Sequence, residues 1–191
     1  MRTYRAANLT TLWFLITINV LVFIFTSVRP DMRSFLGLLP YPYFSIQPWA
    51  IITHMFIHAN FWHILCNMIS LYFLGSFLLR LIGEGKFLIV YFLGGLIGGL
   101  FYVFVSPPPF PIPAVGASGA IFALGGALAM MAPKLPVFMF FIPIPVPLWI
   151  AIIVFLLISF VPGIAWQAHL GGLLLGLGAG YYYKKKRRVY F

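Results

Sequence analysis

Two side chains in strongly apolar surroundings have the chemistry of a hydrolase. Ser118 stands in the run Gly-Ala-Ser-Gly that begins at Gly116, and His169 stands in a second apolar segment further along the chain. A serine hydroxyl becomes a nucleophile when a base accepts its proton, and imidazole is the common base near neutral pH. We therefore expect a catalytic pair of Ser118 and His169. The chain has only two acidic residues, Asp31 in an expected loop and Glu84 near the opposite side of the membrane from Ser118. Neither is placed to assist His169, so we expect a catalytic dyad without a carboxylate.

Hydrogen-bond donors for a developing oxyanion stand around the same serine. We expect Ser118 to open a helix, whose first backbone N–H groups have no partners within the helix. Glycine in the Gly116 region and at Gly119 allows a tight turn and a close approach of substrate. His63 and Asn67 are four residues apart and therefore share one helix face, from which both side chains can donate to the same oxygen.

Small residues indicate how the two reactive side chains come together. Gly172 and Gly176 form a Gly-x-x-x-Gly pair just after His169, and small residues recur every four positions from Gly119 onward. Such positions let helix backbones approach closely in a membrane. We expect the two helices to pack tightly and to bring His169 within hydrogen-bond reach of the serine.

Each feature has a simpler explanation when it is taken alone. A membrane serine often serves packing or bonds to its own helix, and a glycine pair often serves helix contact alone. His54 and His58, also four residues apart, are compatible with a metal or haem site, which is the less favoured explanation. All four histidines and the serine stand toward the same side of the expected membrane, and this joint pattern favours catalysis.

The composition predicts the environment in which these residues act. Of the 191 residues, 63% are hydrophobic and only 7% are charged, with a mean hydropathy of +1.06. Soluble domains carry about 25% charged residues. These values exclude a soluble enzyme, a disordered protein and a disulfide-rich secreted module. The single Cys66 cannot form an intrachain disulfide and is expected to be a small buried apolar residue. The chain is therefore predicted to be an integral membrane protein.

Six apolar segments predict an all-α polytopic protein with one transmembrane domain over residues 1–191. The fourth segment, with about 16 residues, would span only about 24 Å, less than the roughly 30 Å of hydrocarbon. We therefore expect a short fourth helix that starts inside the membrane, next to a wet pocket. The six expected spans cover residues 11–28, 61–82, 87–105, 117–132, 148–160 and 164–183.

The net charge of +10 predicts the orientation of these spans. Six spans place both termini on one side, and ten of the twelve Lys and Arg residues fall there, five of them in the run 184–188. The positive-inside rule makes that side cytoplasmic, with the basic run beside anionic lipid of the bilayer. We therefore expect a multi-pass protein of the cell membrane that binds no nucleic acid. The Ser118 site is expected to open toward the extracytoplasmic side.

The joint pattern resembles the rhomboid family of intramembrane serine proteases, in its compact six-helix prokaryotic or archaeal form. The resemblance runs from about Thr53 to Gly176 and keeps the family's order of motifs. The matching motifs are His58, His63-x-x-x-Asn67, Gly-Ala-Ser-Gly-Ala-Ile-Phe from Gly116 to Phe122, and Ala-His-x-x-Gly-x-x-x-Gly from Ala168 to Gly176.

The resemblance implies a serine endopeptidase that cleaves a peptide bond in or near the transmembrane helix of membrane-protein substrates, without a metal or cofactor. It implies that Ser118 attacks the carbonyl and that His169 acts as base and then as acid. The Ser118 backbone amide, His63 and Asn67 would line the oxyanion hole. The resemblance also implies that His58 lies near a site that retains water and that Phe122 packs against the catalytic histidine.

One departure and two alternatives accompany this interpretation. Many rhomboids carry a Trp-Arg pair in the first long loop, whereas Arg29 and Arg33 here have no Trp before them, so we expect altered loop anchoring and intact chemistry. A catalytically inactive rhomboid-like protein that binds membrane clients is the main alternative, although Ser118 and His169 are both present. A transporter is disfavoured because the polar residues stop halfway through the membrane.

Overall fold

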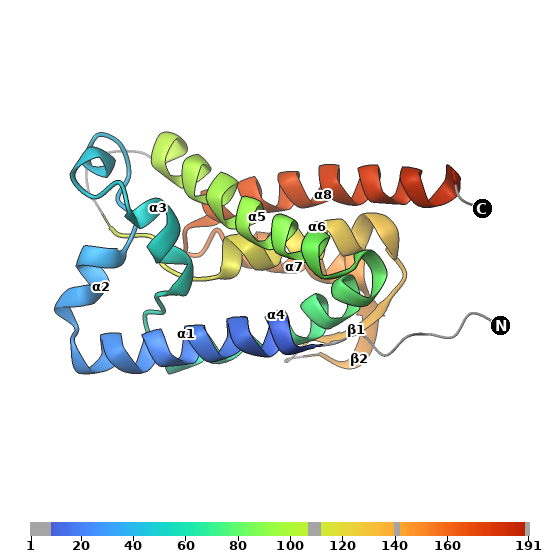
Figure 1. Cartoon of the computed structure of the whole chain (residues 1–191), viewed down its shortest axis with the longest axis horizontal. Helices are drawn as coiled ribbons and strands as arrows, with labels where there is room; N and C mark the ends of the chain where they lie inside the picture. Colours follow the sequence, from blue (N-terminus) through green and yellow to red (C-terminus); the bar gives the residue numbers. More distant parts are fainter. Residues whose placement is uncertain (1–8, 107–111, 140–141, 190–191) are drawn as a thin grey trace.

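The structure is a computed structural model and describes residues 9–106, 112–139 and 142–189. Helices form most of it. Three helices are long and apolar enough to cross a membrane, α1 (Thr10–Val28), α4 (Phe61–Ile82) and α5 (Glu84–Val105). Two shorter apolar helices follow, α6 (Ser118–Met131) and α7 (Leu148–Ile158), and α8 (Trp166–Val189) ends the bundle. Figure 1 shows that α1 begins and α8 ends at the same end of this bundle.

The connection between α1 and α4 lies at the opposite end of the bundle (Figure 1). It contains the short helices α2 (Asp31–Leu36), η1 (Tyr43–Ile46), α3 (Ala50–Thr53) and η2 (His54–Phe56). Side chains tie its turns together, since Trp49 Nε1 donates to the Phe35 carbonyl at 3.0 Å and Thr53 Oγ1 donates to the Leu36 carbonyl at 2.7 Å. These bonds fix the segment that leads into α4.

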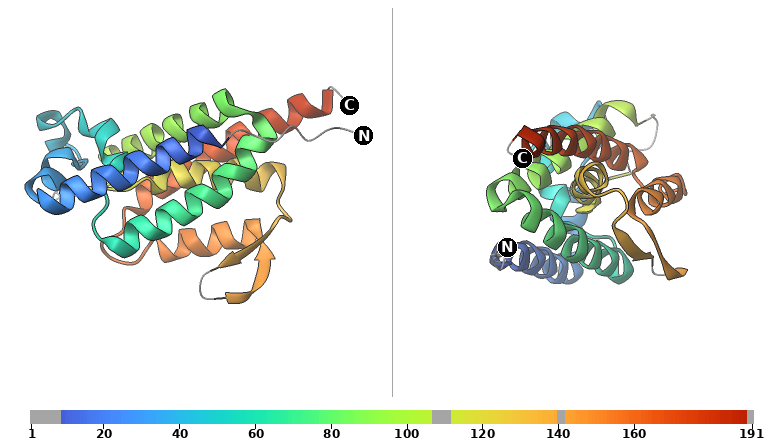
Figure 2. Two further views of the ribbon diagram at one scale, coloured as in Figure 1. Left: turned by 60° about the horizontal axis from the view of Figure 1, so that its bottom comes forward. Right: turned by 90° about the vertical axis from the view of Figure 1, so that its right-hand side faces the viewer.

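A two-stranded antiparallel hairpin of β1 (Pro136–Met139) and β2 (Ile142–Pro147) joins α6 to α7. Sequence analysis expects a purely helical protein, and the hairpin corrects that expectation to a mostly helical one. Proline breaks helices but keeps φ suitable for extended backbone, and a two-stranded ribbon tolerates its missing N–H on an outer edge. Figure 2 shows the hairpin projecting from the side of the helical bundle.

Helix α6 lies at the centre of the core, and every residue from Gly119 to Leu128 except Phe122 is buried. Glycines on its neighbours allow the close approach. A Cβ atom at Gly94 of α5 would lie 2.2 Å from the Ala123 Cβ atom, and one at Gly176 of α8 would lie 2.1 Å from the Ala123 carbonyl oxygen. The close packing of α6 with α8 that the small residues predict is therefore present.

Cys66 differs from the sequence-based expectation. Its side chain is exposed on α4, where a helix of a membrane bundle can face lipid as readily as core. The apolar pattern of α4 is nearly continuous, so the sequence does not distinguish its two faces.

Candidate active site

Ser118 is the first residue of α6, at the point where an extended segment turns into the helix. Ala114 pairs with Leu38 in that segment, and the Gly116 N–H donates to the His54 carbonyl at 2.9 Å. Gly116 has φ +125°, a backbone conformation that residues other than glycine rarely adopt. The turn leaves Ser118 half-buried at a helix N-terminus, with backbone N–H groups free of intrahelical partners.

His169 of α8 faces the Ser118 hydroxyl directly. The His169 Nε2 and Ser118 Oγ atoms are 2.7 Å apart, a hydrogen-bond distance, and the His169 side chain is buried. Gly172 makes this distance possible because it lies one turn along α8 and packs on the Gly119 carbonyl of α6. The arrangement suits transfer of the hydroxyl proton to Nε2.

Two further side chains hold the His169 ring. The Phe122 ring stacks on it, with centroids 4.5 Å apart and planes inclined by 20°. The Ser159 hydroxyl lies 2.6 Å from Nδ1 on the other side of the ring. Sequence analysis singles out Phe122 but not Ser159, because a lone serine after an apolar helix shows no pattern that relates it to a histidine ten residues later.

His63 and Asn67 lie on α4, a different helix from the one that carries His169. The Ala59 backbone N–H donates to His63 Nδ1 at 3.3 Å, so the ring proton is carried by Nε2. A Cβ atom built at Gly116 would lie 2.8 Å from this Nε2 and 3.4 Å from Ser118 Oγ, so both atoms border the same backbone. His63 Nε2 therefore lies near the Ser118 hydroxyl.

Asn67 is buried one turn further along α4. Its amide nitrogen donates one hydrogen to the His63 carbonyl at 2.8 Å, and this bond fixes the side chain against its own helix. An amide nitrogen carries two hydrogens, so a second donor remains for a ligand. Asn67 and His63 therefore share one face, as their four-residue spacing predicts.

The other two histidines differ from each other. His54 is buried and its Nδ1 lies 2.8 Å from the Ala50 carbonyl. His58 is completely buried, 5.0 Å from the His63 ring between centroids, and neither of its ring nitrogens has a partner among the described residues. Within those residues, no three His, Cys, Asp or Glu side chains are grouped as metal ligands.

Comparison with known families identifies this arrangement. The model of the Rhomboid domain matches residues 45–186, well over half of the chain and all of the residues described above as the site. The chain belongs to the rhomboid family. A rhomboid domain is polytopic, so the chain is a mostly helical, multi-pass membrane protein.

Two relatives illustrate the extent of the similarity. This rhomboid is 29% identical over 153 residues to Rhomboid protein 1, mitochondrial, of Saccharomyces cerevisiae, which covers 71% of this chain and 42% of the yeast protein. It is 27% identical over 179 residues to Rhomboid protease GlpG of Salmonella newport, which covers 88% of this chain and 61% of that relative. The chain thus spans about two fifths to three fifths of the length of these relatives.

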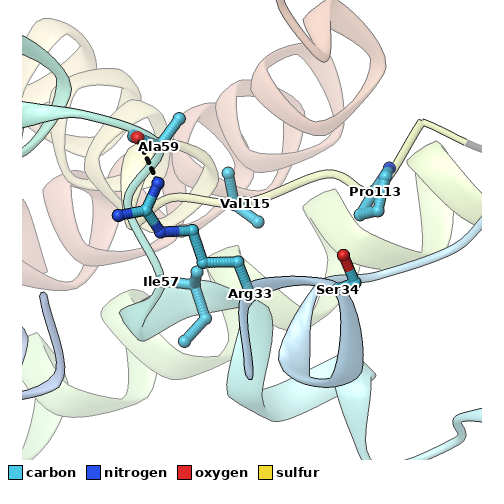
Figure 3. A pocket seen from close by; sticks show the side chains of 6 residues that line it. All are labelled: Arg33, Ser34, Ile57, Ala59, Pro113 and Val115. Atoms are coloured by element: carbon cyan, nitrogen blue, oxygen red, sulfur yellow. Dashed lines mark hydrogen bonds between the residues drawn. The ribbon is translucent and has the colours of Figure 1, made fainter. Parts of the chain in front are cut away.

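An open pocket in this rhomboid lies beside Ala59, the residue whose N–H bonds to His63 (Figure 3). The Arg33 guanidinium crosses it and donates from Nη1 to the Ala59 carbonyl at 3.1 Å, while its Nε donates to the Thr26 carbonyl at 3.1 Å. Arg33 therefore ties the end of α1 to the residue whose N–H fixes His63. The pocket is lined by Arg33, Ser34, Ile57, Ala59, Pro113 and Val115.

Proposed function

We propose that this rhomboid is an intramembrane serine endopeptidase that cleaves a peptide bond in or near the transmembrane helix of membrane-protein substrates. The observation that carries the proposal is the 2.7 Å separation of His169 Nε2 and Ser118 Oγ at the N-terminus of α6. A nucleophile, a base and helix N-terminal donors at one place form the minimum set for acyl transfer.

The reaction starts when Ser118 Oγ attacks the substrate carbonyl carbon while its proton moves to His169 Nε2. The carbonyl oxygen becomes an oxyanion, which the Ser118 backbone N–H, the His63 Nε2–H and the free Asn67 amide hydrogen stabilise. His169 then gives its proton to the leaving amine, and the C–N bond breaks. A water that loses its proton to His169 attacks the acyl-enzyme. The ester bond to Ser118 Oγ then breaks, His169 returns the proton to Oγ, and the new carboxyl group is released. The resemblance to rhomboids suggests that His58, whose ring nitrogens have no partner among the described residues, lies near this water.

In this proposal the six helices α1, α4, α5, α6, α7 and α8 form one transmembrane domain, with both termini in the cytoplasm. Helix α6 has 14 residues and is about 21 Å long, shorter than the hydrocarbon layer, which supports a nucleophile below the membrane surface. Lys184 supports this orientation, since its ammonium donates to the Met130 carbonyl at the end of α6 remote from Ser118. The site then faces the extracytoplasmic side, where a transmembrane substrate reaches it.

The test is labelling with a serine-directed fluorophosphonate. The purified chain in detergent micelles is treated with the probe, and the adduct is located by mass spectrometry. We expect modification at Ser118, loss of it in Ser118→Ala, and strong slowing in His169→Ala because the base is missing. Cleavage of a model transmembrane substrate should vanish in both variants while folding persists.

An exposed serine provides the matched control. Ser45 lies in η1, and its hydroxyl donates to the carbonyl of Pro42, just before that helix. Ser45→Ala removes this hydroxyl and should leave labelling and cleavage unchanged. Wild-type cleavage by Ser118→Ala, or no adduct at Ser118 in a folded sample, would overturn the proposal. Binding of the model substrate without any cleavage by the unmodified chain would favour a client-binding protein.

A further inference from the structure

Both ring nitrogens of His169 have a side-chain partner, although only one faces the nucleophile. Nε2 lies 2.7 Å from Ser118 Oγ, and Nδ1 lies 2.6 Å from Ser159 Oγ. Ser159 and His169 are both buried, so water competes little for this second bond. The protonation of Nδ1 decides whether Nε2 can act as a base, because a neutral imidazole carries one proton on either nitrogen.

The hydrogen bonds around Ser159 specify the direction of this contact. Ser159 Oγ lies 2.8 Å from the Phe155 carbonyl oxygen, which can only accept. The single hydroxyl hydrogen of Ser159 is therefore donated to Phe155, and the Ser159 oxygen accepts the Nδ1–H of His169. His169 is then neutral with its lone pair on Nε2, directed at the Ser118 hydroxyl. The opposite tautomer would point an N–H at the nucleophile and abolish the base.

The described residues offer no carboxylate for this task. Asp31 pairs with Arg29 at 2.9 Å, and Glu84 accepts a hydrogen bond from Thr11. In serine hydrolases with a triad, a carboxylate accepts the Nδ1–H and holds the imidazole in the productive tautomer. Ser159 occupies the corresponding place around the His169 ring, with a neutral oxygen instead of a charged one.

The position of Ser159 in the fold explains how it is held there. It directly follows α7, whose buried side chains all belong to its first half, from Leu148 to Ile152. Ser159 is only 2% exposed and is thus the buried polar contact at the other end of α7. Phe160, the next residue, stacks on Trp166 at the start of α8, with ring centroids 5.1 Å apart.

We propose that Ser159 is a positioning residue that holds His169 in the Nδ1–H tautomer and so makes Nε2 the base. The inference deepens the proposed protease function and rests on it. Ser159 does not touch the substrate and acts only through the imidazole. Its loss should therefore slow the chemical step and leave substrate binding nearly unchanged.

Kinetics of the full-length chain provide the first test. Ser159→Ala should lower kcat for a model transmembrane substrate by about three- to tenfold, the usual weight of one neutral hydrogen bond, with KM unchanged. Ser159→Thr keeps the hydroxyl and should recover most of the lost kcat. Ser76→Ala is the matched control, because Ser76 is also buried and bonds only to its own helix, at the Phe73 carbonyl.

The second test reads the tautomer directly and needs no activity. Nitrogen-15 NMR of histidine-labelled protein distinguishes Nδ1–H from Nε2–H, and the His169 signals are assigned by their absence in His169→Gln. The unmodified chain should show the Nδ1–H form at His169, and Ser159→Ala should show a mixture. An Nε2–H form in the unmodified chain would overturn the inference even if Ser159→Ala fails to fold.

The two proposals fail in distinguishable ways. If the chain cleaves substrate and Ser159→Ala keeps both the kcat and the tautomer of the unmodified chain, the inference is wrong and the protease function stands. If the chain cleaves nothing while His169 shows the Nδ1–H form, the protease function fails and the hydrogen-bond assignment stands.

Discussion

Alanine at Gly172 tests whether the contact between α6 and α8 sets the distance between nucleophile and base. Gly172 lies one turn after His169, and its backbone faces Gly119, the residue after Ser118. A Cβ atom there would lie 2.0 Å from the Gly119 carbonyl oxygen. Real Cβ contacts begin near 3.0 Å and become ordinary at 3.4 Å, so the helices must separate locally by about 1.0–1.4 Å.

This displacement acts directly on the proposed catalytic pair. The obstructing atom is a backbone oxygen, which cannot turn aside as the end of a flexible side chain can. If the whole shift falls on the pair, the bond of 2.7 Å between Ser118 and His169 lengthens to about 3.7–4.1 Å, beyond hydrogen-bond reach. A misplacement of about 1 Å costs about 10²-fold in rate. We therefore expect Gly172→Ala to lower kcat by about a hundredfold. We also expect it to lower the free energy of unfolding by about 1–3 kcal/mol.

The assay measures kcat on a model transmembrane substrate together with thermal unfolding of the same preparation. Gly178→Ala is the control on the same helix, because a Cβ atom there meets nothing within 4 Å. It should keep the kcat of the unmodified chain and lose no stability, since alanine favours helix over glycine by about 0.8–1.0 kcal/mol. A folded Gly172→Ala variant with kcat within about threefold of the unmodified chain would refute the reasoning.

Three further predictions concern side chains around the pair. Asn67→Ala should lower kcat by about 10²–10³, as loss of one oxyanion donor does, and an unchanged kcat would exclude Asn67 from that role. Phe122→Leu removes the ring stacked on the imidazole and should lower kcat by about two- to tenfold, the weight of one aromatic pair, with recovery in Phe122→Tyr. Arg33→Gln breaks the bond to Ala59 and should lower both kcat and the unfolding temperature, whereas Arg29→Gln, which breaks an exposed ion pair, should change neither measurably. Equal effects of the two arginine variants would contradict the role of Arg33.

The sequence is most informative where residue type and local spacing carry the signal. Ser118 and His169 stand out because polar groups are rare in apolar segments, and the glycines near each of them indicate a close helix contact. The spacing of His63 and Asn67 places both on one face, because i and i+4 positions of a helix are neighbours. The structure brings Ser118, His169 and His63 close to one another at the start of α6, and Asn67 bonds to the His63 carbonyl one turn along α4.

The sequence is less informative where a long-range pairing decides the outcome. The prolines after α6 predict a break in the helix, but the pairing of Pro136 with Pro147 that makes a hairpin depends on how the chain returns. The missing Trp-Arg pair predicts altered anchoring of the first loop. Only the structure assigns that anchoring to Arg33, which bonds to the carbonyls of Thr26 and Ala59.

The sequence by itself determined the membrane environment and singled out Ser118 and His169 as the candidate catalytic pair, because hydrophobic content and the rarity of polar residues are properties of composition and local order. Only the tertiary structure showed which side chain contacts the other nitrogen of His169. Ser159 reaches His169 because α7 ends beside the first turns of α8, and a hydrogen bond of 2.6 Å requires that meeting in space. Spacing along the chain does not encode such a contact, since it depends on where two packed helices place their ends.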